Sequence, residues 1–199
     1  HEAQLNFKLL APLGITEVPS LQELNANLPF RVPVLSAALA TQDWSQAVLL
    51  HPKSNGSGVE YPIEKYVALS KYLVEIGYQV YFTGTEKEGA CFRAQIPVHS
   101  NISDATGKWD LQTFIYIISK AKALVACSTG PYHLAGLSGI RAVGLFASRK
   151  PIHPGRWAAL GKGATALVFD PNCQLCAEGR ACTCVAQISI DQIADAIEA

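Results

Sequence analysis

The residues best suited to chemistry form one stretch, from Cys127 to Ala135, which reads CSTGPYHLA. An apolar run over residues 123–126 precedes it and predicts a buried strand, and residues 134–138 predict a short helix after it. The free N–H groups at the start of such a helix can bind a phosphate or another anion. The stretch therefore predicts a nucleotide-diphosphate pocket, with an ordinary capped strand-to-helix turn as the alternative.

Each residue of the turn suits one of these purposes. Ser128 or Thr129 can cap the helix, and Pro131 fits its first turn, where a missing N–H has no consequence. Gly130 lets a ligand approach the backbone closely. We expect His133, on the first helical turn, to belong to the site.

Composition and charge limit the classes of function. The chain has 199 residues, of which 49% are hydrophobic and 16% are charged, so it can bury a large core. Lys plus Arg and Asp plus Glu each number 16, and no basic run occurs, which argues against a nucleic-acid partner. No apolar segment is long enough to span a bilayer, and no signal peptide is recognisable. Because the chain begins at His1 and lacks Met, we expect it to be a fragment, a processed chain or an incomplete sequence.

Strand and helix patterns alternate along the chain. The predicted strands are residues 47–50, 78–82, 123–127, 142–146 and 165–169, with a further short one at 96–99. The predicted helices are residues 4–13, 62–76, 86–94, 111–121, 131–138 and 191–198. Such alternation predicts an α/β fold, a Rossmann-like doubly wound parallel sheet covered on both faces.

The main domain is expected over residues 46–199. Residues 1–45 are interpreted as the tail of an amino-terminal domain followed by a linker, which contains one short strand at most. Ligands of such sheets bind beyond the carboxyl ends of the strands. The turns expected to meet there are residues 51–58, 83–88, 128–133 and 147–157.

Four blocks in these turns resemble the carboxyl-terminal half of the ADP-heptose:lipopolysaccharide heptosyltransferase family, glycosyltransferase family 9. The resemblance covers residues 46–199 and depends on the order and spacing of the blocks. The blocks are His51-Pro52 with Gly56-Ser57 and Tyr61-Pro62; Thr83-Gly84 with Glu86 and Glu88; Ser128 to Ala135; and Leu145-Phe146 followed by Arg156-Trp157.

The resemblance implies the second domain of a GT-B glycosyltransferase, which binds the nucleotide-sugar donor, usually ADP-heptose. The implied reaction is inverting transfer of heptose to the lipopolysaccharide inner core, with no metal or other cofactor. It further implies a cytoplasmic location, with peripheral contact with the inner membrane. The general base would lie in an amino-terminal domain that is absent from this chain, which we therefore expect to be inactive by itself.

The resemblance also implies a set of donor-binding residues. They are Lys53, Ser54, Asn55, Gly84, Glu86, Ser128, Thr129, Gly130, Pro131 and His133. The loop from Lys53 would face the diphosphate, Glu86 (or Glu88) would accept bonds from the ribose hydroxyls, and the turn from Thr129 would stabilise the leaving diphosphate.

Two positions depart from the family pattern. Ser128 stands where many members have Asp, so a different nucleotide sugar is an alternative donor. Val59 stands where many have Lys or Arg, and Lys53 could supply that charge from the same loop. A non-catalytic nucleotide-binding module is a further alternative. A generic Rossmann oxidoreductase is disfavoured, because no G-x-G-x-x-G follows the first strand.

The remaining candidates have structural alternatives. Cys173, Cys176, Cys182 and Cys184 could hold zinc, but the C-x-C spacing favours reduced thiols or a disulfide. Cys91 and Cys127 are interpreted as small core residues. His51 is interpreted as a structural histidine, and His99 and His153 as solvated ones. Arg156 and Trp157 form either a stacked surface pair or part of the cleft.

Overall fold

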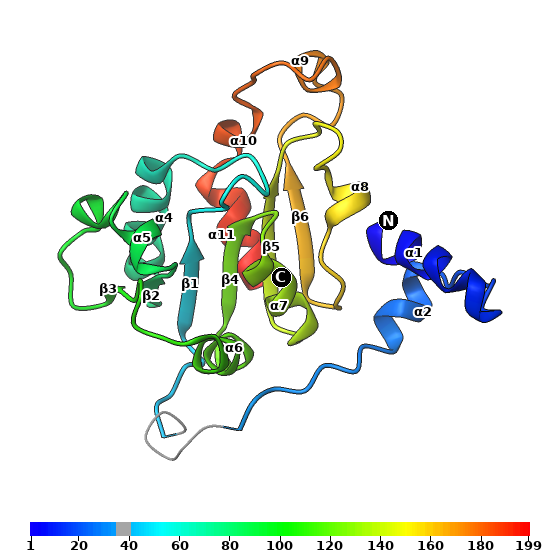
Figure 1. Ribbon diagram of the computed structural model, residues 1–199. Helices are drawn as coiled ribbons and strands as arrows, with labels where there is room; N and C mark the ends of the chain where they lie inside the picture. Colours follow the sequence, from blue (N-terminus) through cyan, green and yellow to red (C-terminus); the bar gives the residue numbers. More distant parts are fainter. Residues whose placement is uncertain (35–40) are drawn as a thin grey trace.

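The computed structural model describes residues 1–34 and 41–199 as a single six-stranded sheet with flanking helices. Every pair of neighbouring strands is parallel, and the order is β3-β2-β1-β4-β5-β6 (Figure 1). The strands are β1 (Ala47–His51), β2 (Gln79–Phe82), β3 (Ile102–Asp104), β4 (Ala123–Cys127), β5 (Arg141–Phe146) and β6 (Ala164–Val168). The direction of winding reverses between β1 and β4, the position at which open α/β sheets bind ligands.

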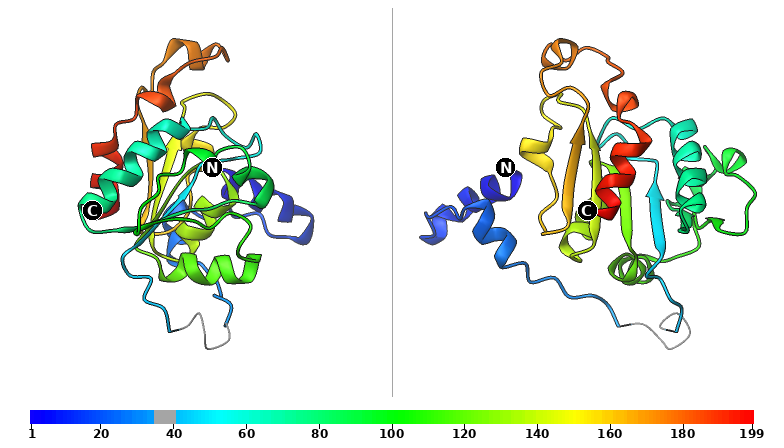
Figure 2. Two further views of the ribbon diagram at one scale, coloured as in Figure 1. Left: turned by 90° about the vertical axis from the view of Figure 1, so that its left-hand side faces the viewer. Right: turned by 180° about the vertical axis from the view of Figure 1, so that it is seen from behind.

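The longer helices cover both faces of the sheet (Figure 2). One face packs against α4 (Ile63–Glu75) and α11 (Ile190–Glu198), and the other packs against α6 (Leu111–Lys120) and α7 (Gly130–Leu137). The shorter elements are α1 (Glu2–Phe7), η1 (Lys8–Leu13), α2 (Leu21–Ala26), α5 (Glu86–Gly89), η2 (Arg93–Gln95), α8 (Pro154–Trp157), α9 (Gln174–Ala177) and α10 (Cys184–Gln187). The predicted doubly wound parallel sheet is therefore confirmed.

The centre of the sheet follows from the alternation of side chains along each strand. Val48 and Leu50 of β1 pack into the core beneath α4 and α11, whereas Ala47 and Leu49 pack into the core beneath α6 and α7. All five residues of β1 are buried. A strand buried on both faces needs an unbroken apolar run, which is why this one was recognisable in the sequence.

Local signals fix where the main helices begin and end. The Asp110 carboxylate accepts a hydrogen bond from the Thr113 N–H at 2.8 Å and caps α6, as its position in the sequence predicted. Gly77 follows α4 with φ at +100°, a conformation that a side chain would disfavour. These ends set the lengths of the helices and therefore the positions of the loops at the carboxyl edge.

The strand predicted at residues 96–99 is wrong. These residues precede β3, and Val98 is fully exposed. The strand forms instead where Ile102 pairs with Val80 and is buried against the core. Pro97 has no N–H for a strand ladder, so the burial of Ile102 determines the register of this edge strand.

Two predicted helices are shorter or less regular than expected. Residues 86–94 contain α5 and η2 separated by a break, because Phe92 adopts φ −138° and turns into the core. Residues 4–13 contain the end of α1 and the 3-10 turn η1, which holds Pro12. Gly14 ends this segment in the left-handed conformation, as expected.

The region interpreted as a linker contains α2, which begins with a capping box between Ser20 and Glu23. No strand forms in the described part of residues 20–45, and residues 35–40 of that prediction lie outside the described residues. The amino-terminal helices lie beside α8 (Figure 1), where His1 Nε2 is 2.9 Å from the Ala158 carbonyl oxygen. None of the helices in the described ranges is long and apolar enough to cross a membrane.

Candidate functional site

The turn after β4 is the centre of the candidate site. Thr129 occupies the N-cap position of α7 and makes no side-chain bond to the helix, so its hydroxyl is not used as a cap. Pro131 lies in the first turn, as predicted. A Cβ atom built on Gly130 would have no heavy atom within 4 Å, so this glycine leaves open space rather than relieving a packing clash. These properties suit a turn that meets a ligand.

The loop after β1 is held against this turn by small residues. The Ser57 hydroxyl bonds the carbonyl oxygens of Ser54 at 2.8 Å and of Ser128 at 2.7 Å. A Cβ on Gly58 would lie 3.2 Å from the Ser128 nitrogen, so a side chain would crowd the contact. Asn55 has φ +51° and folds the loop back at its tip. The two loops are therefore joined through the Ser57 hydroxyl.

A hollow of about 350 Å³ lies beyond the carboxyl ends of β1, β2 and β4, and we call it the first hollow. Trp109 and Phe114 form an aromatic wall, with ring centroids 6.2 Å apart and planes at 25°. The full lining is His51, Ser54, Asn55, Thr83, Gly84, Thr85, Glu88, Ala105, Gly107, Trp109, Leu111, Phe114, Thr129 and Pro131. Aromatic, amide, hydroxyl and carboxylate groups therefore face a common space.

The two acidic candidates beside this hollow are placed differently. Glu86 does not line it, and both of its carboxylate oxygens accept from the Arg93 guanidinium, at 2.7 and 2.9 Å. These hydrogen bonds lower the pKa of Glu86. Glu88 does line the hollow, and its Oε2 accepts from the N–H and hydroxyl of Thr85, at 2.7 and 2.9 Å. Of the two predicted carboxylates, Glu88 is the one positioned to meet a ligand.

A second hollow, of about 390 Å³, lies on the other side of the same turn. Its lining is Ser57, Ser128, Thr129, Gly130, His133, Pro151, Ile152, Arg156 and Trp157. Thr129 is shared with the first hollow, so the turn after β4 separates the two spaces. Arg156 lies over the Trp157 ring, 5.5 Å from its centroid, and its Nε donates to Glu2 at 2.6 Å. Arg156 and Trp157 therefore form both a stacked pair and part of a cleft.

Lys53 lies away from both hollows. It forms an ion pair with Glu60 and lines a separate space beside Cys91 and Phe92. The hydrogen bond to Glu60 raises the pKa of Lys53. The structure does not bring Lys53 to the turn after β4.

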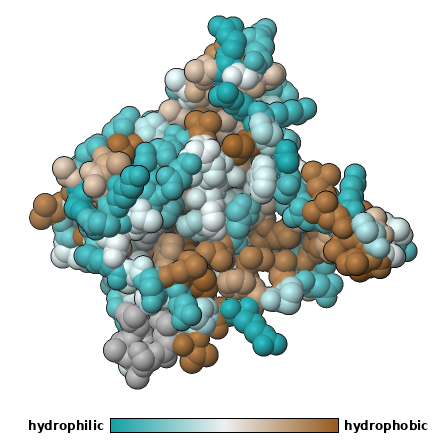
Figure 3. Space-filling view, in the orientation of Figure 1, coloured by the Kyte–Doolittle hydropathy of each residue, from teal (hydrophilic) through white to brown (hydrophobic). Residues whose placement is uncertain are grey.

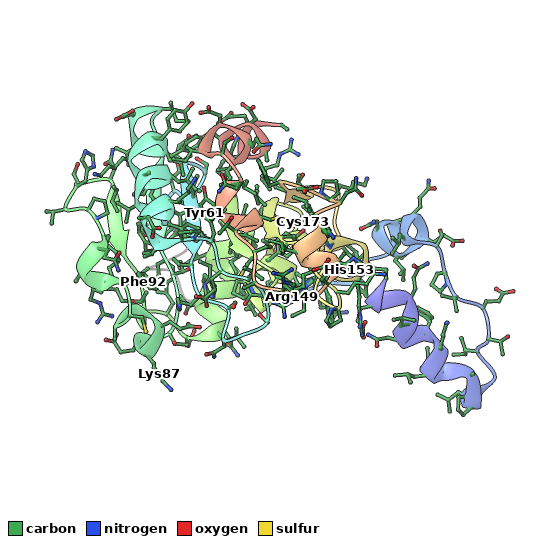
Figure 4. The ribbon with its side chains drawn as sticks, turned by 90° about the horizontal axis from the view of Figure 1, so that it is seen from above. Tyr61, Lys87, Phe92, Arg149, His153 and Cys173 are labelled. Carbon is green, nitrogen blue, oxygen red and sulfur yellow. The ribbon has the colours of Figure 1, made fainter. Side chains whose placement is uncertain are left out.

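Other cations lie beside Val59. Arg149 and Lys150 line a further hollow, of about 350 Å³, together with Gly56 and Val59. This further hollow borders the second one through Pro151 and Ile152, which line both. In Figure 4, which looks down on this edge, Arg149 lies near the middle of the molecule and Lys87 at its rim.

Two histidines at the site are held without charge. His51 Nδ1 lies 2.9 Å from the Thr83 hydroxyl, and burial lowers the pKa of His51 to about 4. His133 is half-buried, with its ring centroid 6.4 Å from that of Trp157, and burial lowers its pKa as well. A neutral His133 offers a hydrogen bond rather than a charge. His51 is structural, as interpreted from the sequence, but it also lines the first hollow.

The structure brings together eight of the ten predicted residues. Ser54, Asn55, Gly84, Thr129 and Pro131 line the first hollow, and Ser128, Thr129, Gly130 and His133 line the second. The exceptions are Lys53 and Glu86. The prediction missed Trp109, Leu111 and Phe114, which line the first hollow around the helix cap at Asp110.

The cysteines line neither of the two hollows. Cys173, Cys176, Cys182 and Cys184 lie together in the segment before α11. The interpretation of Cys91 as a core residue is wrong, because it is exposed just beyond α5, with its thiol 3.5 Å from the Lys87 carbonyl oxygen. Cys127 is buried in β4, as expected.

Sequence comparison identifies the family. Residues 1–184 match the sequence profile of Glycosyltransferase family 9 (heptosyltransferase). The chain belongs to glycosyltransferase family 9. The resemblance inferred from the four blocks is thereby confirmed. No curated protein matches the chain significantly in sequence.

Solved structures share the fold of this family member at low sequence identity. The family 9 glycosyltransferase from Veillonella parvula superposes with a TM-score of 0.68 at 18% identity, covering 100% of this chain and 59% of that one. The E. coli ADP-heptose LPS heptosyltransferase II gives 0.64 at 16% identity, covering 92% and 52%. The E. coli heptosyltransferase WaaC with ADP gives 0.65 at 16% identity, covering 95% and 53%. The chain therefore spans a little over half the length of these structures.

Proposed function

We propose that this chain is the donor-binding half of a heptosyltransferase-like enzyme and binds an ADP-sugar. The single observation that carries the proposal is the position of Thr129 between two hollows of similar volume, about 350 and 390 Å³. A nucleotide sugar has a nucleoside at one end, a sugar at the other and a diphosphate between them. A helix N-terminus flanked by two spaces suits a ligand of that shape.

The first hollow is assigned to the nucleoside. The Trp109 and Phe114 wall can take the flat face of a base, and Glu88 can accept hydrogen bonds from ribose hydroxyls. The E. coli heptosyltransferase WaaC, which shares the fold, has been solved with ADP, and this supports adenine as the base.

The diphosphate is assigned to the turn between the hollows. The Thr129 hydroxyl and the backbone N–H of Gly130 would donate hydrogen bonds to the phosphate oxygens. Arg149 and Lys150 would supply the positive charge that Val59 does not provide. Negative charge grows on the diphosphate as the bond to the sugar breaks. Fixed donors that surround it therefore lower the barrier to transfer.

The second hollow is assigned to the sugar. Trp157 offers an apolar ring surface, while Ser128 and His133 offer neutral hydrogen-bonding groups. Heptose is the sugar that family membership favours. The hydroxyl of Ser128 carries no charge, however, and this observation favours a second candidate, a donor with another sugar on the same kind of diphosphate.

The acceptor is proposed to be the lipopolysaccharide inner core, at the cytoplasmic face of the inner membrane. Attack by an acceptor hydroxyl from the side opposite the diphosphate would invert the configuration at the sugar. A general base must take the proton of that hydroxyl, and we assign this base to the other half of the enzyme. The chain itself therefore binds and orients the donor and stabilises the leaving group.

Calorimetry on this chain with ADP, UDP, GDP and ADP-heptose tests the proposal. We expect ADP to bind at least about tenfold more tightly than UDP or GDP, and ADP-heptose to bind more tightly still, because it fills both hollows. Equal affinity for all four ligands, or no binding, would overturn the donor assignment. ADP binding without a gain from heptose would favour the second candidate sugar.

Catalysis is tested separately by adding an amino-terminal half of a family 9 enzyme in trans and following transfer to an inner-core acceptor. We expect ADP release to require both halves and the acceptor. If ADP binds but no combination of halves and acceptors gives transfer, the chain is a non-catalytic nucleotide-binding module.

A further inference from the structure

The segment between β6 and α11, residues 169–189, stands above the carboxyl edge of the sheet (Figure 1). Over residues 171–183, every residue is exposed except Cys173, Cys176 and Cys182. This part of the chain therefore buries no side chains other than those of its cysteines. A segment of this kind has no hydrophobic core of its own, so other interactions must stabilise its conformation.

The four cysteine sulfurs of this segment converge on one point. The Sγ atoms of Cys173, Cys176, Cys182 and Cys184 all lie within 4.8 Å of one another, and none belongs to a disulfide. Four thiolates about 2.3 Å from a tetrahedral metal ion lie about 3.8 Å from one another. The arrangement therefore has the dimensions of a tetrathiolate site.

The backbone of the segment explains how the sulfurs meet. Cys173 is the N-cap of α9 and Cys176 lies within it, so one helical turn brings the first pair together. Gly179, with φ +70°, then reverses the chain, and the Arg180 N–H closes the turn on the Leu175 carbonyl oxygen at 2.8 Å. The second pair, Cys182 and Cys184, returns to the first across this turn.

The other cysteines show that clustering is particular to this segment. Cys127 packs alone in the core of β4, and Cys91 is exposed beyond α5. Simple burial accounts for Cys127. It does not account for Cys182, whose side chain is only half-buried and whose sulfur lies 3.0 Å from that of Cys176.

We propose that Cys173, Cys176, Cys182 and Cys184 bind one thiophilic metal ion, zinc or iron, in a closed tetrathiolate site. Four soft sulfur donors in tetrahedral geometry select these metals over Mg²⁺ or Ca²⁺. With all four positions filled by protein, the ion has no open site for a substrate and acts structurally.

The metal site would position the loop of residues 53–58 as well as the cysteine segment itself. Just beyond α10, the Ile188 carbonyl oxygen accepts a hydrogen bond from the Tyr61 hydroxyl at 2.9 Å. Tyr61 follows the loop of residues 53–58, part of which lines both hollows. A metal that orders the segment would thus stabilise the fold next to the candidate site without touching a ligand there.

Metal analysis of the whole chain, purified with a phosphine reductant and without chelators or an affinity metal, tests the proposal. We expect about one zinc or iron per chain, with Cys173→Ser and Cys182→Ser reducing the content at least fivefold. Cys91→Ser is the matched control, since it removes a thiol outside the cluster, and it should keep the full content. Zinc or iron in stoichiometric amount supports the proposal and identifies the ion.

A second measurement uses only the wild-type chain, so it remains informative if the cysteine variants fail to fold. Co²⁺ added to the reduced, metal-free wild-type chain should give the intense visible absorption of tetrahedral cobalt thiolate, and Zn²⁺ should displace it. A chain that contains less than a tenth of an equivalent of metal and gives no such absorption would overturn the proposal. So would an intact disulfide between cluster cysteines, found by mass spectrometry in a chain purified separately without reductant. Neither measurement depends on donor binding, so failure of the metal proposal can be distinguished from failure of the proposed function.

Discussion

The two hollows on either side of Thr129 differ in what holds them in shape. The first is built on strand ends and fixed by contacts at the carboxyl edge of the sheet, such as the bond between His51 and Thr83 and the capping box of Thr85 and Glu88. The second depends on the irregular chain between β5 and β6 and on Arg156, whose ionic partner Glu2 is 154 residues away in the sequence. The sheet thus fixes the proposed nucleoside site, whereas an irregular segment between strands shapes the proposed sugar site.

The largest expected effect comes from the residue that the two hollows share. Replacing Thr129 by Trp fills the space between them, so ADP affinity should fall at least about 100-fold, equal to about 3 kcal/mol, in calorimetry. Val98→Trp adds the same ring at a fully exposed position outside the hollows and should bind ADP normally. Unchanged ADP binding by the Thr129 variant would show that the nucleotide lies elsewhere.

Stability should depend on pH through the first hollow. Burial lowers the pKa of His51 from 6.5 to about 4, so between these pH values His51 is protonated in the unfolded chain and neutral in the folded chain. The stabilisation is complete above pH 6.5 and is lost as pH falls towards 4, by about 3 kcal/mol. Denaturant unfolding of wild type and His51→Gln at pH 7.5 and 4.5 measures this. The variant should lose less stability on acidification, and an equal loss in both proteins would contradict the assignment.

The two carboxylates of α5 sharpen the placement of the nucleoside. Glu88→Gln should weaken ADP binding about tenfold, because the ribose hydroxyls then bond a neutral amide oxygen instead of a charged carboxylate. Glu86→Gln is the matched control, and since Glu86 bonds Arg93 outside the hollow it should change ADP affinity by less than about twofold. The difference in affinity between the Glu88 and Glu86 variants should be smaller for 2′-deoxy-ADP than for ADP. Equal effects of the two variants on ADP binding would contradict the geometry.

The smallest effects should distinguish the cations. Arg149→Ala and Lys150→Ala should each weaken ADP binding about threefold and reduce its dependence on salt, because exposed charges contribute modestly. Lys53→Ala should leave the affinity within about twofold, since Glu60 already pairs Lys53 away from both hollows. A larger loss from Lys53→Ala than from the other two would reverse this assignment.

Much of the fold could be predicted because it depends on local patterns. β1 and β4 are unbroken apolar runs, and α6 begins at a recognisable cap, Asp110. The edge strand was misplaced because Ile96 and Ile102 are equally apolar. Only pairing with β2 decides which of them is buried in a strand.

The turn after β4 could be predicted for the same reason, since its residues are consecutive. The rest of the site depends on contacts between segments far apart in the sequence. Glu86 and Glu88 are the same type of residue, and their contacts distinguish them: Arg93 binds Glu86, whereas the capping box with Thr85 holds Glu88. Trp109 reaches the first hollow through the path of the chain after β3, for which the sequence carries no periodic signal.

The ion pair between Arg156 and Glu2 joins the lining of the second hollow to the amino-terminal segment. Hydrophobic residues, drawn in brown, are abundant on that segment at the right of Figure 3, and Leu9 and Leu13 are 75% and 76% exposed. An anionic group that engages the Arg156 guanidinium would have to share it with, or take it from, the Glu2 carboxylate. By thermodynamic reciprocity, detachment of the segment would then raise the affinity for such an anion, and the anion would favour detachment. The amino-terminal segment would thus compete with any anion that binds Arg156.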